Sequence, residues 1–154
     1  MATTTRAPAH TLRRRPGWFH PVPLRSRRDG WSAARQCAFL VQLYVTGSVT
    51  TAARAVGMSR ASAYRLRERA EAASFAHAWD RVLSLPGWER AQPPREDFRK
   101  VTTATLLARL ERELVQPVVH RGAMAGIRTK PDISTLLRLV RRTERWPLES
   151  YEGE

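Results

Sequence analysis

Arginine side chains with one aromatic neighbour gather between Ser59 and Arg69, a stretch that could recognise nucleic acid. A guanidinium group is planar and can donate two parallel hydrogen bonds to a guanine edge or to a phosphate. On a helix that enters the major groove, the first residues usually contact bases and the later ones contact phosphates. We therefore place four residues in the groove, namely Ser59, Arg60, Tyr64 and Arg65. Arg67 and Arg69 are placed on the phosphates, and Ser62 is counted with the DNA-binding residues.

The residues around this stretch predict a helix-turn-helix over 47–69. Ser48 suits the N-cap of a first helix, and Ser59 suits the N-cap of a second. Gly57 can adopt the positive φ that ends the first helix and turns the chain. Apolar or small residues recur at helical spacing and would form the core between the two helices. These core positions are Ala53, Val56, Gly57, Met58, Ala63 and Leu66.

The overall charge favours a polyanionic partner. The chain has 154 residues, with 27 basic and 14 acidic side chains, which give a formal net charge of +13. Such an excess is typical of proteins that bind nucleic acid or an anionic membrane surface. The length suits one domain, or one small domain with an appendage.

Several classes of site are absent from the sequence. Cys37 is the only cysteine, so an intrachain disulfide is excluded, and its place in an apolar stripe predicts a buried thiol. No Cys/His spacing suits zinc, and we expect neither a metal nor a cofactor. A phosphate loop and a nucleophile triad are missing, and His120 is a poor catalytic candidate, so we expect a protein that is not an enzyme. No apolar run suits a membrane span or a secretory signal, which favours a cytoplasmic protein.

Residues 1–30 are expected to form a disordered basic arm, because four prolines interrupt a stretch rich in Thr and Arg. Such an arm often tracks phosphates or enters a minor groove, and a merely solubilising tail is an equal alternative. Trp18 and Phe19 are too apolar for a spacer and could dock on the domain. The arm carries two arginine clusters, Arg13, Arg14 and Arg15, and Arg25, Arg27 and Arg28.

Residues 31–85 are expected to form the DNA-binding domain. A helix over 31–46, ended by Gly47, would support the helix-turn-helix from behind. A further helix over 72–85, with Ser74 as a candidate cap, would place Trp79 in the core.

The second half should begin with a proline-rich linker over 86–94, followed by a region over 95–146 for oligomerisation or partner binding. We expect a long helix over 95–116 and a β-hairpin over 117–130 with a turn at Arg121-Gly122. Asp132 would cap a last helix that ends near Arg142, and residues 147–154 form an acidic tail. That helix carries a second basic surface of Arg138, Arg141, Arg142 and Arg145. The expected fold is therefore mainly α: an N-terminal helix-turn-helix bundle, a long helix, a small β-hairpin and a C-terminal helix.

Two stretches resemble the small terminase subunits of tailed phages and prophages. The first is FLVQLYVTGSVTTAARAVGMSRASAYRLRERAEAASFAHAWDRVL, where a support helix ends in a TGSVTAAAR-like sequence. The second is ELVQPVVHRGAMAGIRTKPDISTLLRLVRRTERW, with a Pro-Val strand, an x-Gly turn and an aspartate-started helix. Thr143 replaces the proline of the family's closing motif, and the basic arm is not part of the family pattern.

The resemblance implies a non-enzymatic recognition subunit. Members of the family bind the packaging site on double-stranded DNA, form a ring-like homo-oligomer and present the DNA to a separate large ATPase/nuclease subunit. The DNA contacts would carry over to Ser59, Arg60, Tyr64 and Arg65, and self-association to the helix over 95–116. A chromosomal transcriptional regulator would have the same features. A protein-interaction module, whose arginines form only a solvated face, is the other alternative.

Overall fold

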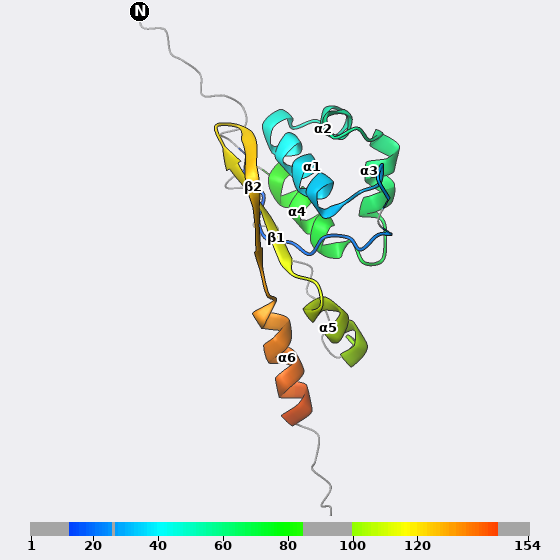
Figure 1. Ribbon diagram of the computed structural model, residues 1–154, viewed down its shortest axis with the longest axis vertical. Coiled ribbons are helices and arrows are strands. Elements are labelled where there is room, and N and C mark those ends of the chain that lie inside the picture. Colours follow the sequence, from blue (N-terminus) through cyan, green and yellow to red (C-terminus); the bar gives the residue numbers. More distant parts are fainter. Residues whose placement is uncertain (1–12, 26, 85–99, 145–154) are drawn as a thin grey trace, which may run out of the picture.

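The computed structural model describes residues 13–25, 27–84 and 100–144. Figure 1 shows a helix bundle beside a long β-hairpin, with two further helices at the base of the hairpin. The fold expected from the sequence, mainly helical with a hairpin and a C-terminal helix, is confirmed. The described elements are α1 (Ala33–Thr46), α2 (Val49–Ala55), α3 (Arg60–Arg67), α4 (Ala73–Leu83), α5 (Thr103–Leu110), β1 (Leu114–His120), β2 (Ala123–Lys130) and α6 (Ile133–Glu144). None of the described helices is long and apolar enough to cross a membrane.

Local sequence signals set the limits of the first three helices. Ser32, Ser48 and Ser59 are the N-caps, and each side chain accepts a hydrogen bond from the backbone N–H three residues later. Gly47 follows α1 with a φ of 68°, and Gly57 lies in the turn between α2 and α3 with a φ of 76°. Both glycines therefore occupy left-handed conformations, as predicted.

Aromatic side chains fill the centre of the helix bundle. The ring of Phe39 on α1 lies 5.5 Å from that of Trp31, 6.1 Å from that of Phe75 and 4.9 Å from that of Trp79. All four side chains are buried, which confirms Trp79 as a core anchor. Tilted and edge-on ring pairs add specific geometry to the apolar burial, so α1 and α4 hold a defined orientation.

The N-terminal segment over 13–25 is packed on the domain, so the prediction of disorder is wrong for these residues. Phe19 is only 1% exposed, which confirms its docking. Its backbone N–H donates to the carbonyl of Val115 at 3.0 Å, and the reverse bond is 2.9 Å. Val22 exchanges two further bonds with the side chain of Gln36, at 2.8 and 3.1 Å. The prolines prevent a helix, but they allow this extended segment to lie beside β1.

The start of α4 corrects a smaller prediction. Ala72 is the N-cap residue, and no side chain caps this helix. The hydroxyl of Ser74 accepts instead from the backbone N–H of His20, at 2.8 Å. Ser74 therefore holds the N-terminal segment rather than the helix end.

The predicted hairpin is present and longer than expected. Arg121 and Gly122 form its turn with φ values of 49° and 76°, the backbone twist that suits a two-residue connection. The strands pair antiparallel from Leu114 opposite Lys130 to the turn, with an irregularity between Val118 and Val119.

The helix predicted over 95–116 is confirmed over Thr103–Leu110, but its predicted C-terminal end is wrong. The helix α5 ends at Leu110, and Leu114 already belongs to β1. The valines that follow Leu114 favour a strand, and Val115 is held there by its bonds to Phe19. Tertiary pairing therefore overrides the helical stripe that ran through Leu114.

The last helix begins as predicted and extends to Glu144. Asp132 Oδ1 accepts from the backbone N–H of Thr135 at 3.1 Å, and Oδ2 accepts from its hydroxyl at 2.6 Å. The same Oδ2 lies 2.8 Å from Nε2 of His20. Burial alone would raise the pKa of Asp132, but the hydrogen bonds from Thr135 and His20 outweigh burial and lower it.

The hairpin and the helix bundle share one core. Val115 of β1 and Phe19 belong to the same buried cluster as the side chains of α1 and α4. Both strands contact α1, whereas α5 and α6 contact each other at the far end of the hairpin (Figure 1). The start of the predicted arm, the linker over 86–94 and the tail over 147–154 lie outside the described residues.

Candidate nucleic-acid interface

The inner face of the helix-turn-helix fixes α3 on the bundle. Ala53 of α2 and Ala63 of α3 are fully buried, and Leu66 is nearly so. Small side chains at these positions allow the two helices to approach closely. Val56 and Met58 are partly buried against the same core. These positions match the predicted core, and Gly57 supplies the turn between the helices.

The outer face of α3 presents the predicted groove residues. Arg60 and Arg65 are exposed, as is Arg69 just beyond the helix. Tyr64 is 37% exposed, and its ring rests 5.3 Å from that of Trp79. The guanidinium carbon of Arg60 lies 5.5 Å from the Tyr64 ring, within the range of a cation–π contact. The core thus orients Tyr64, and Tyr64 in turn orients Arg60.

Arg67 has a different role from the one assigned to it. Its Nη2 lies 2.8 Å from Oδ1 of Asp80, and its Nη1 donates to the carbonyl of Ala76 at 3.3 Å. The guanidinium also lies 5.1 Å from the ring of Trp79. These three contacts commit its donors to α4, so we withdraw Arg67 from the phosphate-binding set. Asp80 lies thirteen residues later, and nothing in the local pattern marked it as a partner.

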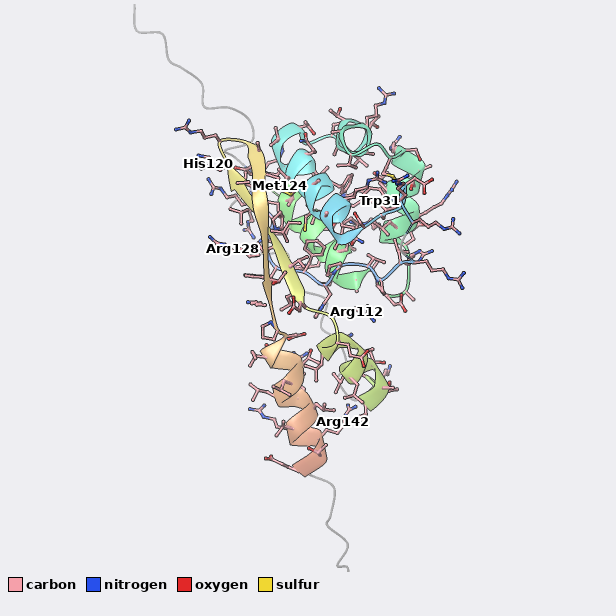
Figure 2. The ribbon with its side chains drawn as sticks, viewed as in Figure 1. Trp31, Arg112, His120, Met124, Arg128 and Arg142 are labelled. Carbon is pink, nitrogen blue, oxygen red and sulfur yellow. The ribbon has the colours of Figure 1, made fainter. Side chains whose placement is uncertain are left out.

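The two serines of α3 act mainly within the fold. Ser59 caps the helix through the backbone N–H of Ser62, at 3.1 Å. The hydroxyl of Ser62 accepts from the indole N–H of Trp31, at 2.8 Å. Trp31 is buried at the start of α1, and Figure 2 shows it beside α3. Sequence reasoning missed this contact, which ties the two helices together; Ser62 is therefore a weaker candidate for base contact than Arg60 or Arg65.

The two arginine clusters of the N-terminal segment have separate positions. Arg13 donates to the carbonyls of Tyr44 and Val45, at 3.1 and 3.4 Å, and so satisfies the C-terminal end of α1. Arg13 therefore stabilises the fold. The second cluster remains exposed and ends three residues before Trp31, whose indole reaches α3; its members are Arg25, Arg27 and Arg28.

Metal binding and nucleophilic catalysis by cysteine find little support among the described residues. They contain no group of three His, Cys, Asp or Glu side chains that could hold a metal ion. Cys37 is buried in α1, as predicted, and burial raises the pKa of its thiol to about 12. A neutral thiol of this kind is a poor nucleophile at physiological pH.

Comparison with known protein families, with curated proteins and with solved structures finds no match to this chain.

Proposed function

We propose that this chain is a sequence-reading protein for double-stranded DNA and that α3 is its recognition helix. One observation carries the proposal: Arg60 and Arg65 are exposed on a helix whose opposite face, at Ala63 and Leu66, is buried in the core. A helix fixed in this way presents its donors without first having to order them, which lowers the entropic cost of binding.

The shape and the charge of the molecule support DNA over other polyanions. An α-helix fits the major groove, where guanine offers the two acceptors that a guanidinium group recognises. The net charge of +13 adds attraction to phosphates that does not depend on sequence. A surface that bound only by charge would not require Arg60 to be oriented by Tyr64.

The biological role that we favour is DNA recognition in a packaging machine of the phage type, or in a prophage-derived relative. The resemblance of the helix-turn-helix and hairpin stretches to small terminase subunits supports this role. A large ATPase/nuclease subunit would then be the protein partner, and this chain would have no catalytic activity of its own. Regulation of chromosomal transcription is the alternative, because a repressor would present the same helix.

Self-association is part of the proposal, and α6 rather than the predicted long helix supports it. The exposed apolar side chains of α6 follow the i, i+3, i+4, i+7 pattern of one helix face. They are Ile133, Leu136, Leu137 and Val140, with exposed fractions of 53, 42, 53 and 42%. A second copy of the chain would bury this stripe. The same stripe also favours the third candidate, a protein-interaction module without specific DNA binding.

The deciding experiment is a salt titration of DNA binding by the full chain. Fragments of its own genome are compared with random-sequence duplex. We expect a few fragments to remain bound at physiological salt, and their positions separate packaging sites from promoters. Binding that is equal for all fragments and disappears with salt would refute sequence reading, and self-association without saturable DNA binding would favour the interaction module.

A further inference from the structure

The hairpin lies on the flank of the bundle opposite the recognition helix. Among the described residues, β1 and β2 contact α1 but neither α2 nor α3, and α1 itself reaches α3 through α2 and α4. Figure 1 shows the hairpin and α3 on opposite sides of α1. The hairpin is therefore not a wing that follows α3 into the same groove, and any ligand on it occupies a separate site.

The composition of the hairpin points to an anionic ligand. The range 114–130 contains no acidic residue, whereas Arg121, Arg128 and Lys130 are basic. Arg128 and Lys130 lie two residues apart on β2, so their side chains leave the same face of the ribbon. The ammonium group of Lys130 is held 4.4 Å from the ring of Trp18.

The N-terminal segment brings a further arginine to this face. Gln116 pairs with Arg128 across the hairpin, and its side chain donates to the carbonyl of Pro16 at 3.4 Å. Arg15 is thereby placed next to Arg128, and the two side chains line one pocket of about 140 Å³. The described residues provide no acidic partner for either arginine. Figure 2 shows Arg128 on the outer side of the hairpin.

The pocket has the size and the donors for a phosphate group. Its volume of about 140 Å³ far exceeds the ~10–15 Å³ that one water needs. Two prolines, two valines and Gln116 form the rest of its lining, and the amide of Gln116 already donates to Pro16. The two guanidinium groups are therefore its main side-chain donors. Arginine binds phosphate oxygens through two parallel hydrogen bonds, and two such forks can hold one phosphate or neighbouring phosphates of one strand.

We propose that Arg15 and Arg128, with Lys130 beside them, bind the phosphate backbone of a second stretch of DNA. The proposal rests on the proposed function, because α3 is taken to hold the first stretch. The helix α1 lies between α3 and the hairpin, so the exposed face of α3 and Arg128 lie on opposite flanks of the bundle (Figure 1). A straight duplex seated on α3 therefore does not reach Arg128, and each chain holds two stretches of duplex on opposite flanks.

The test is the number of short duplexes bound by each full-length chain, measured by sedimentation at saturating DNA. A count per chain is independent of how many copies of the protein associate. We expect two duplexes for the wild-type protein, one for the Arg15→Ala/Arg128→Ala variant and one for the Arg60→Ala/Arg65→Ala variant. Arg141→Ala removes an exposed arginine from α6 and should still bind two.

The outcomes separate this proposal from the proposed function. A wild-type chain that binds a single duplex, or an Arg15→Ala/Arg128→Ala variant that binds two, would overturn the hairpin site. If the Arg60→Ala/Arg65→Ala variant binds two duplexes while the hairpin variant binds one, recognition by α3 fails and the hairpin site stands. Removal of one phosphate-binding arginine from the hairpin site should also reduce the slope of log K against log salt by about 0.9.

Discussion

Arg67 and Asp80 form an ion pair between α3 and α4, with 2.8 Å between Nη2 and Oδ1. The same guanidinium lies over the ring of Trp79. One of the arginines in the basic stretch is thus part of the scaffold, while Arg60 and Arg65 face outwards. This division produces opposite expectations for neighbouring substitutions.

Arg67→Ala should weaken folding more than DNA binding. The pair with Asp80 is partly exposed, with side-chain exposures of 27 and 52%, so it contributes at most about 1 kcal/mol. Removal of the cation–π interaction with Trp79 adds about 0.5–1 kcal/mol. Denaturant unfolding should show a decrease of this size, with little change in the salt dependence of DNA binding. A decrease in affinity as large as that of Arg65→Ala would return Arg67 to the DNA-binding set.

Arg60→Ala and Arg65→Ala should have the opposite effect. Each should weaken binding to the preferred DNA fragment by about 1–3 kcal/mol, because each removes a candidate base contact. Unfolding curves should be nearly unchanged, since both side chains are exposed. Fluorescence anisotropy measures the affinity, and Arg141→Ala serves as the control for removal of one charge. Equal affinities for all three variants would contradict the assignment of α3.

Ser62→Ala tests whether this serine belongs to the scaffold. The substitution leaves the indole N–H of the buried Trp31 without its acceptor, which costs about 1–3 kcal/mol. We expect a lower unfolding free energy and preserved discrimination between DNA fragments. Trp31→Phe removes the donor of the same hydrogen bond and should likewise preserve the discrimination between DNA fragments. Relaxed discrimination with unchanged stability would show instead that Ser62 contacts a base.

The hydrogen bonds that Asp132 accepts from Thr135 and His20 predict that the stability of the fold depends on pH in the acid range. The pKa of Asp132 is lowered from its ordinary value of 3.8, so its carboxylate binds protons less readily in the folded chain than in the unfolded chain. Its contribution to stability is present above pH ~4 and is lost as the pH falls through the lowered pKa. Asp132→Asn should remove part of this decrease while retaining an acceptor for the backbone of Thr135. Parallel acid-unfolding curves for the two proteins would contradict the prediction.

Leu137→Glu should abolish the self-association that we propose for α6. The side chain is 53% exposed on α6, so a charge there is tolerated in the monomer. Burial of such a leucine in an interface stabilises it by about 1.5–3 kcal/mol, which the substitution would reverse. Sedimentation velocity across a concentration series measures the change. Ser134→Glu, at an exposed polar position of the same helix, is the control and should leave the association intact.

Signals confined to a few neighbouring residues predicted their structures correctly. Ser48 and Ser59 cap helices because a hydroxyl reaches a backbone N–H three residues away, and this needs no other part of the chain. Gly57 and Arg121-Gly122 turn the chain because of their own backbone conformations. The stripe that buries Ala63 and Leu66 follows from helical periodicity.

Contacts between distant parts of the chain decided the remainder. Phe19 orders the N-terminal segment by pairing with Val115, ninety-six residues later. The same pairing holds Val115 in a strand, although the apolar spacing around it predicted a helix. Arg13 and Arg67 are basic residues like their neighbours, and only the positions of α1 and α4 turn them into structural contacts. By itself the sequence determined the helix-turn-helix and its outward arginines, because caps, turns and periodicity act locally. The tertiary structure alone decided which arginines remain available for the proposed DNA contacts, because that depends on which carbonyls and carboxylates the fold brings within hydrogen-bonding distance.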